Sequence, residues 1–278
     1  MDRIPFGVSQ LDSLIGGGSP PGSVVLLAGD PGAGAREFCY TSATINALAH
    51  ADPELFDLHY GSVADAAAPP DEIHYVSFTA SPREIREEIL HTIDDELVDA
   101  AMTEIEFEDL SGEYFQLSPI PRDWYVGERR TLADLGKAHD RRDVLEAFGE
   151  YLTEHAPDGL VLVDALTDLT ALPDEQVDWS EVTMLLHGLK KASQSWGGLV
   201  LVLVNQESLT ETQMGTLTGA ADGTLNFEWE SGGNERDRTM FVREFRGVLS
   251  RIEAEDILRF ETEIHDAGFD ISNVRKIR

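Results

Sequence analysis

The sequence predicts an α/β fold in which a mainly parallel β-sheet is flanked by helices and extended by C-terminal antiparallel hairpin strands. Four short runs rich in Val and Leu lack polar alternation, as expected for strands buried on both faces: residues 24–28, 73–78, 160–163 and 199–204. Helical patterns lie between these runs. Strands that alternate with helices favour right-handed βαβ crossovers, and therefore a parallel sheet.

The helical segments are recognised by the spacing of their apolar residues. A helix is expected over residues 36–49, directly after the first run. Residues 143–152 place their apolar side chains on one face, and residues 182–192 carry a similar stripe. Residues 178–181, Asp-Trp-Ser-Glu, resemble a capping box, which satisfies free backbone N–H groups where a helix begins.

The C-terminal third has a different pattern. Residues 224–230 and 239–245 are strand-like and flank the turn signal Ser-Gly-Gly-Asn at 231–234, and residues 257–264 form another apolar strand pattern. Such segments predict antiparallel hairpins added to one sheet edge. We expect residues 1–278 to form a single domain with insertions near 51–71 and 94–140, which are rich in Pro and charged residues.

The charge is strongly acidic, with 52 Asp and Glu against 21 Lys and Arg and a net charge of −31. Acidic residues are spread along the whole chain, which predicts the solvated surface of a halophilic archaeal protein of the cytoplasm. Nucleic acid is a disfavoured partner, because proteins gain affinity for it by neutralising its phosphates with basic side chains, and this chain is acidic.

The single Cys39 excludes an internal disulfide. The apolar run 199–204 is too short to span a membrane.

A glycine-rich turn joins the first predicted strand to the following helix. Glycines in this position allow backbone N–H groups to face a phosphate at the start of a helix. Measured against the pattern G-x-x-x-x-G-K-[ST], both glycines are present, but Ala replaces the lysine that reaches the β- and γ-phosphates, and Arg replaces the Ser or Thr that ligates Mg²⁺. The alternative is a turn that only closes a tight fold. The candidate residues are Gly29, Asp30, Pro31, Gly32, Ala33, Gly34, Ala35 and Arg36.

The segment before this turn carries a family resemblance. Residues 3–8 (Arg-Ile-Pro-Phe-Gly-Val), Leu11-Asp12 and residues 16–27, which begin Gly-Gly-Gly-Ser-Pro-Pro-Gly, resemble the opening of KaiC/RadA-like proteins of the RecA superfamily. The resemblance extends over nearly the whole chain and is close to the haloarchaeal HTR-like branch, here with a degenerate Walker A motif. It implies a RecA-like P-loop NTPase fold, in which ATP or ADP is bound with Mg²⁺.

The same resemblance assigns further residues. Asp164 ends a strand similar to the Walker B strand and would help to hold Mg²⁺; the alternative is a carboxylate that caps the next segment. Asn205 and Gln206 are similar to the sensor position that detects the γ-phosphate, or else simply bond at a strand end. Arg246 matches the basic segment that reaches a neighbouring subunit's nucleotide. Thr79 stands where relatives carry the glutamate that activates water, and a hydroxyl cannot serve as that base.

Three functions follow from these observations. The first is a degenerate RecA/KaiC-like pseudoenzyme that binds ATP or ADP weakly or not at all and has a regulatory, signalling or scaffolding role, with a homo-oligomer or a signalling protein as partner. The second is an atypical ATPase in which Arg36 replaces the lysine. The third is a RadA-paralogue-like accessory that binds DNA. The first is favoured because the phosphate lysine, the metal ligand and the water-activating acid are altered together, so no residue is assigned a catalytic role.

Overall fold

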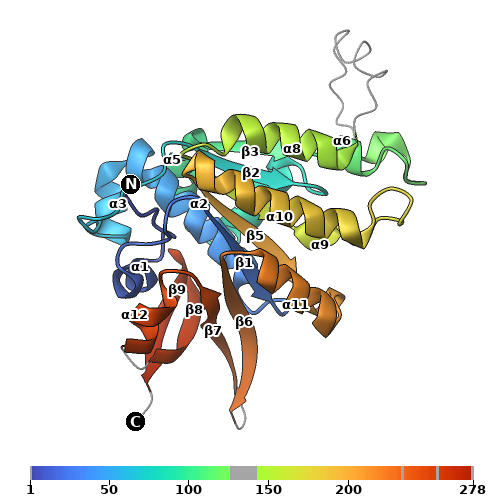
Figure 1. Cartoon of the computed structure of the whole chain (residues 1–278). Coiled ribbons are helices and arrows are strands. Elements are labelled where there is room, and N and C mark those ends of the chain that lie inside the picture. Colours follow the sequence, from blue (N-terminus) through green and yellow to red (C-terminus); the bar gives the residue numbers. More distant parts are fainter. Residues whose placement is uncertain (1, 126–142, 233–234, 255–256, 277–278) are drawn as a thin grey trace.

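The computed structural model describes residues 2–125, 143–232, 235–254 and 257–276 (Figure 1). Within these ranges nine strands form one sheet in the order β3-β2-β4-β5-β1-β6-β7-β8-β9. Strands β1 to β6 pair in parallel, and β6 to β9 pair as antiparallel neighbours. The predicted fold class is therefore confirmed. The strands are β1 (Ser23–Gly29), β2 (Ile73–Ser77), β3 (Ile105–Asp109), β4 (Leu160–Asp164), β5 (Leu199–Asn205), β6 (Gly223–Gly232), β7 (Glu235–Phe245), β8 (Ile257–His265) and β9 (Gly268–Lys276).

Helices cover both faces of the sheet (Figure 1). One group of helices, which includes α2, packs on one face of the sheet. Helices α8, α10 and α11 pack on the other face. The α-helices are α1 (Ser9–Ile15), α2 (Ala35–Ala51), α3 (Pro53–His59), α4 (Pro82–Leu90), α5 (Asp95–Ala101), α6 (Ser111–Tyr114), α8 (Val144–His155), α9 (Leu166–Leu169), α10 (Trp179–Trp196), α11 (Glu211–Ala220) and α12 (Leu249–Ala254). Short 3₁₀ turns are η1 (Met102–Glu104), η2 (Arg122–Trp124) and η3 (Gln206–Ser208).

The central strands explain why the sheet has two cores. In β1, Val25 and Leu27 belong to the core beneath α2, whereas Val24 and Leu26 belong to the core beneath α10. Successive side chains of a strand point to opposite faces, so a continuous apolar run serves both layers. Helix α10 begins as expected, because Asp178 and Glu181 form a reciprocal capping box.

Two strands were not anticipated. Strand β3 lies at the sheet edge, within the region expected to be an insertion, and alternates Ile105 and Phe107 with acidic residues. Strand β9 likewise buries Phe269 and Ile271 and leaves polar residues between them. Edge and half-exposed strands show only short alternation, which is a weak signal beside the central apolar runs. The expected insertion near 51–71 contains helix α3, and residues 126–140 of the second one fall outside the described ranges.

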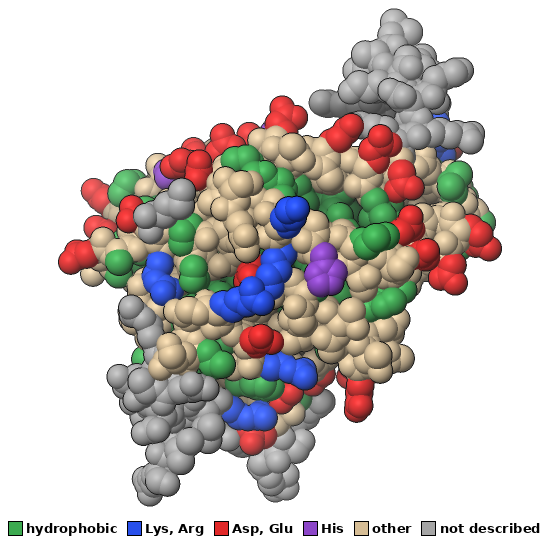
Figure 2. Space-filling model, viewed as in Figure 1, with side chains coloured by type: hydrophobic (Ala, Val, Ile, Leu, Met, Phe, Trp, Pro, Cys, Tyr) green, Lys and Arg blue, Asp and Glu red, His purple; other side chains and the backbone are tan. Residues whose placement is uncertain are grey.

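The surface agrees with the acidic composition. Figure 2 shows Asp and Glu side chains around the rim of the visible face, with Lys and Arg gathered nearer its middle. None of the described helices combines the length and apolar character that crossing a bilayer would require.

Candidate functional site

The phosphate loop lies between β1 and α2, as the sequence predicts. Strand β1 ends at Gly29 and helix α2 begins at Ala35. A cleft of about 530 Å³ opens over this loop, at the carboxyl ends of β1, β4 and β5, which is where parallel α/β sheets place their ligands. It is lined by Gly29, Asp30, Pro31, Gly32, Ala35, Arg36, Glu37, Ala165, Thr167, Asp168, Ala171, Leu203, Val204, Asn205 and Ser208.

The backbone of the loop requires glycine at Gly32 and Gly34, whose φ angles are 74° and 111°. The loop is also held from outside by the β6–β7 hairpin. Trp229 donates from Nε1 to the carbonyl of Pro31 at 3.1 Å, and Arg238 donates from Nε to the carbonyl of Gly32 at 3.0 Å. The Arg238 guanidinium stacks 4.7 Å from the centre of the Trp229 ring. The turn is thus fixed by side chains that the sequence analysis did not identify.

Arg36 forms an ion pair with Asp164 across the cleft. Its Nη2 lies 2.9 Å from Asp164 Oδ1, and the Asp164 side chain is only 9% exposed. Tyr75 donates its hydroxyl to the other carboxylate oxygen, Oδ2, at 2.7 Å. Both oxygens of Asp164 are therefore engaged by protein groups. The carboxylate assigned to Mg²⁺ and the arginine that replaces the other Mg²⁺ ligand satisfy each other.

The surroundings strengthen this pair. Burial alone would lower the pKa of Arg36, but the attraction of Asp164 raises it overall, so the guanidinium stays charged. Burial, and then the charge of Asp164, raise the pKa of Tyr75, which therefore remains a hydrogen-bond donor. Glu88 lies 3.9 Å from Arg36 Nη1 and also accepts a hydrogen bond from Tyr40. The network links α2, α4, β2 and β4.

The charge of the cleft is unfavourable for a triphosphate. Among the described residues that line it, Arg36 is the cation, and Asp30, Glu37 and Asp168 are three carboxylates. Phosphoryl transfer depends on positive charge around the phosphates. Here the guanidinium of Arg36 is already paired with Asp164, so little of its charge remains for a bound anion.

Asp168 is a carboxylate of the cleft that the sequence analysis did not select. It lies four residues after Asp164, in α9, and accepts a hydrogen bond from Thr79 Oγ1 at 3.2 Å. Burial and the nearby charge of Asp164 raise its pKa. Thr79 thus lies beside an acid supplied by α9, the helix that follows β4. The spacing from Asp164 was the only sequence signal available.

The two candidate sensor residues, Asn205 and Gln206, form different kinds of hydrogen bond. Gln206 donates from Nε2 to Asp30 Oδ1 at 2.6 Å and accepts from Asn226 at 3.2 Å, so it connects the phosphate loop to β6. The side chain of Asn205 accepts a hydrogen bond from the backbone of Glu207, which is the local strand-end role that was its alternative. Asn205 nevertheless lines the cleft.

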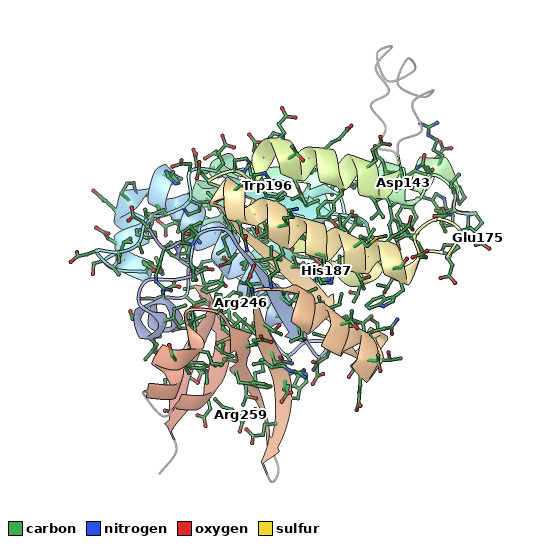
Figure 3. The ribbon with its side chains drawn as sticks, viewed as in Figure 1. Asp143, Glu175, His187, Trp196, Arg246 and Arg259 are labelled. Carbon is green, nitrogen blue, oxygen red and sulfur yellow. The ribbon has the colours of Figure 1, made fainter. Side chains whose placement is uncertain are left out.

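Arg246 is not brought to the phosphate loop of its own chain. Its Nη1 lies 3.8 Å from Asp222, and Asp222 binds the backbone of Val24 at the start of β1. The loop follows the other end of that strand, about 20 Å away at the rise of an extended chain. Figure 3 shows Arg246 between helix α10 and the C-terminal strands.

Comparisons with known proteins agree with this architecture. A KaiC-like protein of Pyrococcus horikoshii OT3 superimposes with a TM-score of 0.61 at 17% identity, over 98% of this chain and 99% of that one. Thirty residues are 63% identical to the DNA repair protein RadA of Mycobacterium tuberculosis, in two strains. That match spans 11% of this chain and only 6% of RadA. No family model matches. The chain therefore has the fold of a KaiC-like protein.

Proposed function

We propose that the chain is a RecA-superfamily P-loop protein of the KaiC/RadA-like kind that has lost Mg²⁺-dependent ATP hydrolysis and has a regulatory, signalling or scaffolding role. The observation that supports this proposal is the Arg36–Asp164 pair, in which a guanidinium engages the carboxylate that the family resemblance relates to Mg²⁺. A metal ion would have to displace both Arg36 and Tyr75 before it could use Asp164.

The remaining features support the same proposal. Ala35 offers no positive charge to the β- and γ-phosphates, and Thr79 offers no base. A nucleotide would be held by the backbone N–H groups of the loop and the start of α2 alone. Binding of ATP or ADP is therefore weak and independent of Mg²⁺. The protein acts in the cytoplasm through a second copy or a signalling partner.

The atypical ATPase is the second candidate, and Asp168 is the observation that favours it. This acid lies in the cleft with a raised pKa and could accept a proton from water. The reaction would also need Arg36 to leave Asp164 and reach the phosphates. DNA binding is ranked last, since the similarity to RadA is confined to 30 residues.

The test is equilibrium binding of ATP and ADP, with and without Mg²⁺, in molar KCl, followed by phosphate release from the same samples. The native chain is expected to show the same weak affinity with and without Mg²⁺ and no release. The double variant Ala35→Lys/Arg36→Thr restores the lysine and the metal-binding hydroxyl of the pattern. Its affinity for the nucleotide is expected to rise by at least about tenfold when Mg²⁺ is added, or about 1.4 kcal/mol.

Phosphate release by the native chain would favour the second candidate function. Mg²⁺-dependent phosphate release by the native chain that is abolished in Arg36→Ala would establish the atypical ATPase. An Asp168→Asn variant would then separate the roles, because it removes the candidate base and leaves the Arg36–Asp164 pair in place.

A further inference from the structure

A second group of chemistry-bearing side chains lies away from the phosphate cleft. One ligand atom from each of Glu72, His74 and His155 falls within 4.8 Å of the other two. Glu72 directly precedes β2, His74 is the second residue of β2, and His155 ends helix α8. Residues far apart in the sequence therefore converge where the end of one helix meets the start of one strand.

This position is separate from the Arg36–Asp164 pair. Ser77 of β2 is the register partner of Asp164, and His74 lies three residues earlier, about 10 Å along the strand. The side chains also point to opposite faces, since Tyr75 faces the core beneath α2 and His74 faces α8. In Figure 3, Asp143 marks the beginning of α8, so His155 lies at the far end of that helix, toward Trp196.

His74 is fixed in an orientation suited to coordination. Its side chain is fully buried, Nδ1 lies 2.9 Å from the hydroxyl of Tyr151, and Nε2 lies 3.2 Å from Glu72 Oε2. Metal-bound histidines commonly have one ring nitrogen oriented by a hydrogen bond while the other faces the ion.

The other two residues provide an opening to solvent. The His155 side chain is 28% exposed, and its ring centre lies 4.9 Å from that of His74. Glu72 is 65% exposed, so its carboxylate can rotate toward an ion without disturbing the core. Glu106, the register partner of His74 on β3, lies 3.6 Å from His74 Nδ1 and adds a further negative charge.

We propose that Glu72, His74 and His155 form a binding site for a divalent transition metal of the Zn²⁺ class. Two imidazoles and one carboxylate are donors that such ions prefer, and water would complete a tetrahedron. Ligand atoms around tetrahedral Zn²⁺ stand roughly 3.4 Å apart, given bonds of about 2.1 Å. The three ligand atoms lie within 4.8 Å of one another, so coordination requires Glu72 and His155 to move closer to His74. The bound ion joins the end of α8 to the start of β2.

The test is titration of the intact chain with Co²⁺, which reports tetrahedral nitrogen and oxygen ligands by its visible absorption, followed by displacement with Zn²⁺. The native chain is expected to bind one equivalent with saturation. His155→Ala and Glu72→Gln each remove an exposed ligand and are expected to weaken binding by at least about tenfold. His187→Ala, an exposed histidine on α10, is the matched control and should bind as the native chain does.

A second measurement covers the case in which a variant is less stable. Zn²⁺ is expected to raise the Tm of the native chain and of His187→Ala, and to raise the Tm of His155→Ala by less at the same Zn²⁺ concentration, because stabilisation by mass action falls as the affinity of the folded state falls. Absence of saturable binding, or binding that His155→Ala and Glu72→Gln do not weaken, would show that the cluster is a set of hydrogen-bonded side chains and would overturn the proposal.

Discussion

The Arg36–Asp164 pair can be tested by a double-mutant cycle. Arg36→Met removes the charge and keeps much of the apolar stem, whereas Asp164→Asn keeps an acceptor for Tyr75. Two unit charges about 4 Å apart attract each other by about 4 kcal/mol at an effective dielectric constant of about 20. Arg36 is 49% exposed, so screening and side-chain entropy reduce the expected coupling to about 1–2 kcal/mol.

The two single substitutions should lower the free energy of unfolding by different amounts. Arg36→Met leaves the buried carboxylate of Asp164 without its cation and is expected to lower the free energy of unfolding by about 1–3 kcal/mol. Asp164→Asn leaves a half-exposed guanidinium that water and Glu88 can still satisfy, so its cost is smaller, about 1 kcal/mol. The double variant should then cost less than the sum of the two.

Urea unfolding in about 1 M KCl measures these energies. Added Mg²⁺ is a further test: it should stabilise Arg36→Met, in which Asp164 Oδ1 has lost its cation and only Tyr75 still engages the carboxylate, and leave the native chain unchanged. If the two substitutions prove additive within about 0.5 kcal/mol, the pair contributes no coupling, and the idea that Arg36 substitutes for the metal loses its basis.

Three further predictions concern other parts of the chain. Trp229→Phe removes the indole donor to the phosphate loop and should speed amide hydrogen exchange at residues 30–34, measured by mass spectrometry; unchanged exchange would mean that the hairpin does not restrain the loop. Burial raises the pKa of Asp12 from 3.8 to about 7, so its stabilising contribution is present below pH about 4 and is lost as the pH rises through about 7. Urea unfolding should show this decline in the native chain relative to Asp12→Asn, and parallel profiles would contradict it. Lys190 is 13% exposed and lies 3.3 Å from Asp222, so Lys190→Met should cost about 1–3 kcal/mol in chemical denaturation, while the exposed neighbour Lys191→Met should stay within about 0.5 kcal/mol; equal costs would argue against the buried pair.

Local sequence patterns were sufficient to predict the layered α/β fold and the glycine-rich turn that joins its first strand to the following helix. Apolar runs without alternation identify strands covered on both faces, and the two glycines at the end of the first run identify the turn. These are local signals, because burial on both faces and a positive φ each restrict the residue types at single positions. The same local comparison placed Ala35 and Arg36 where the pattern G-x-x-x-x-G-K-[ST] has Lys and then Ser or Thr.

The partners of Arg36 are visible only in the folded chain. The pairing of Arg36 in α2 with Asp164 in β4 joins residues 128 positions apart, and Tyr75 comes from a second strand, β2. Likewise, the register of β2 with its neighbours and the end of α8 bring His74 and His155 together. Such contacts depend on strand order, which periodicity cannot specify. The Arg36–Asp164 pair is therefore a property of the assembled sheet, since the two residues become neighbours only after β4 has taken its place in it.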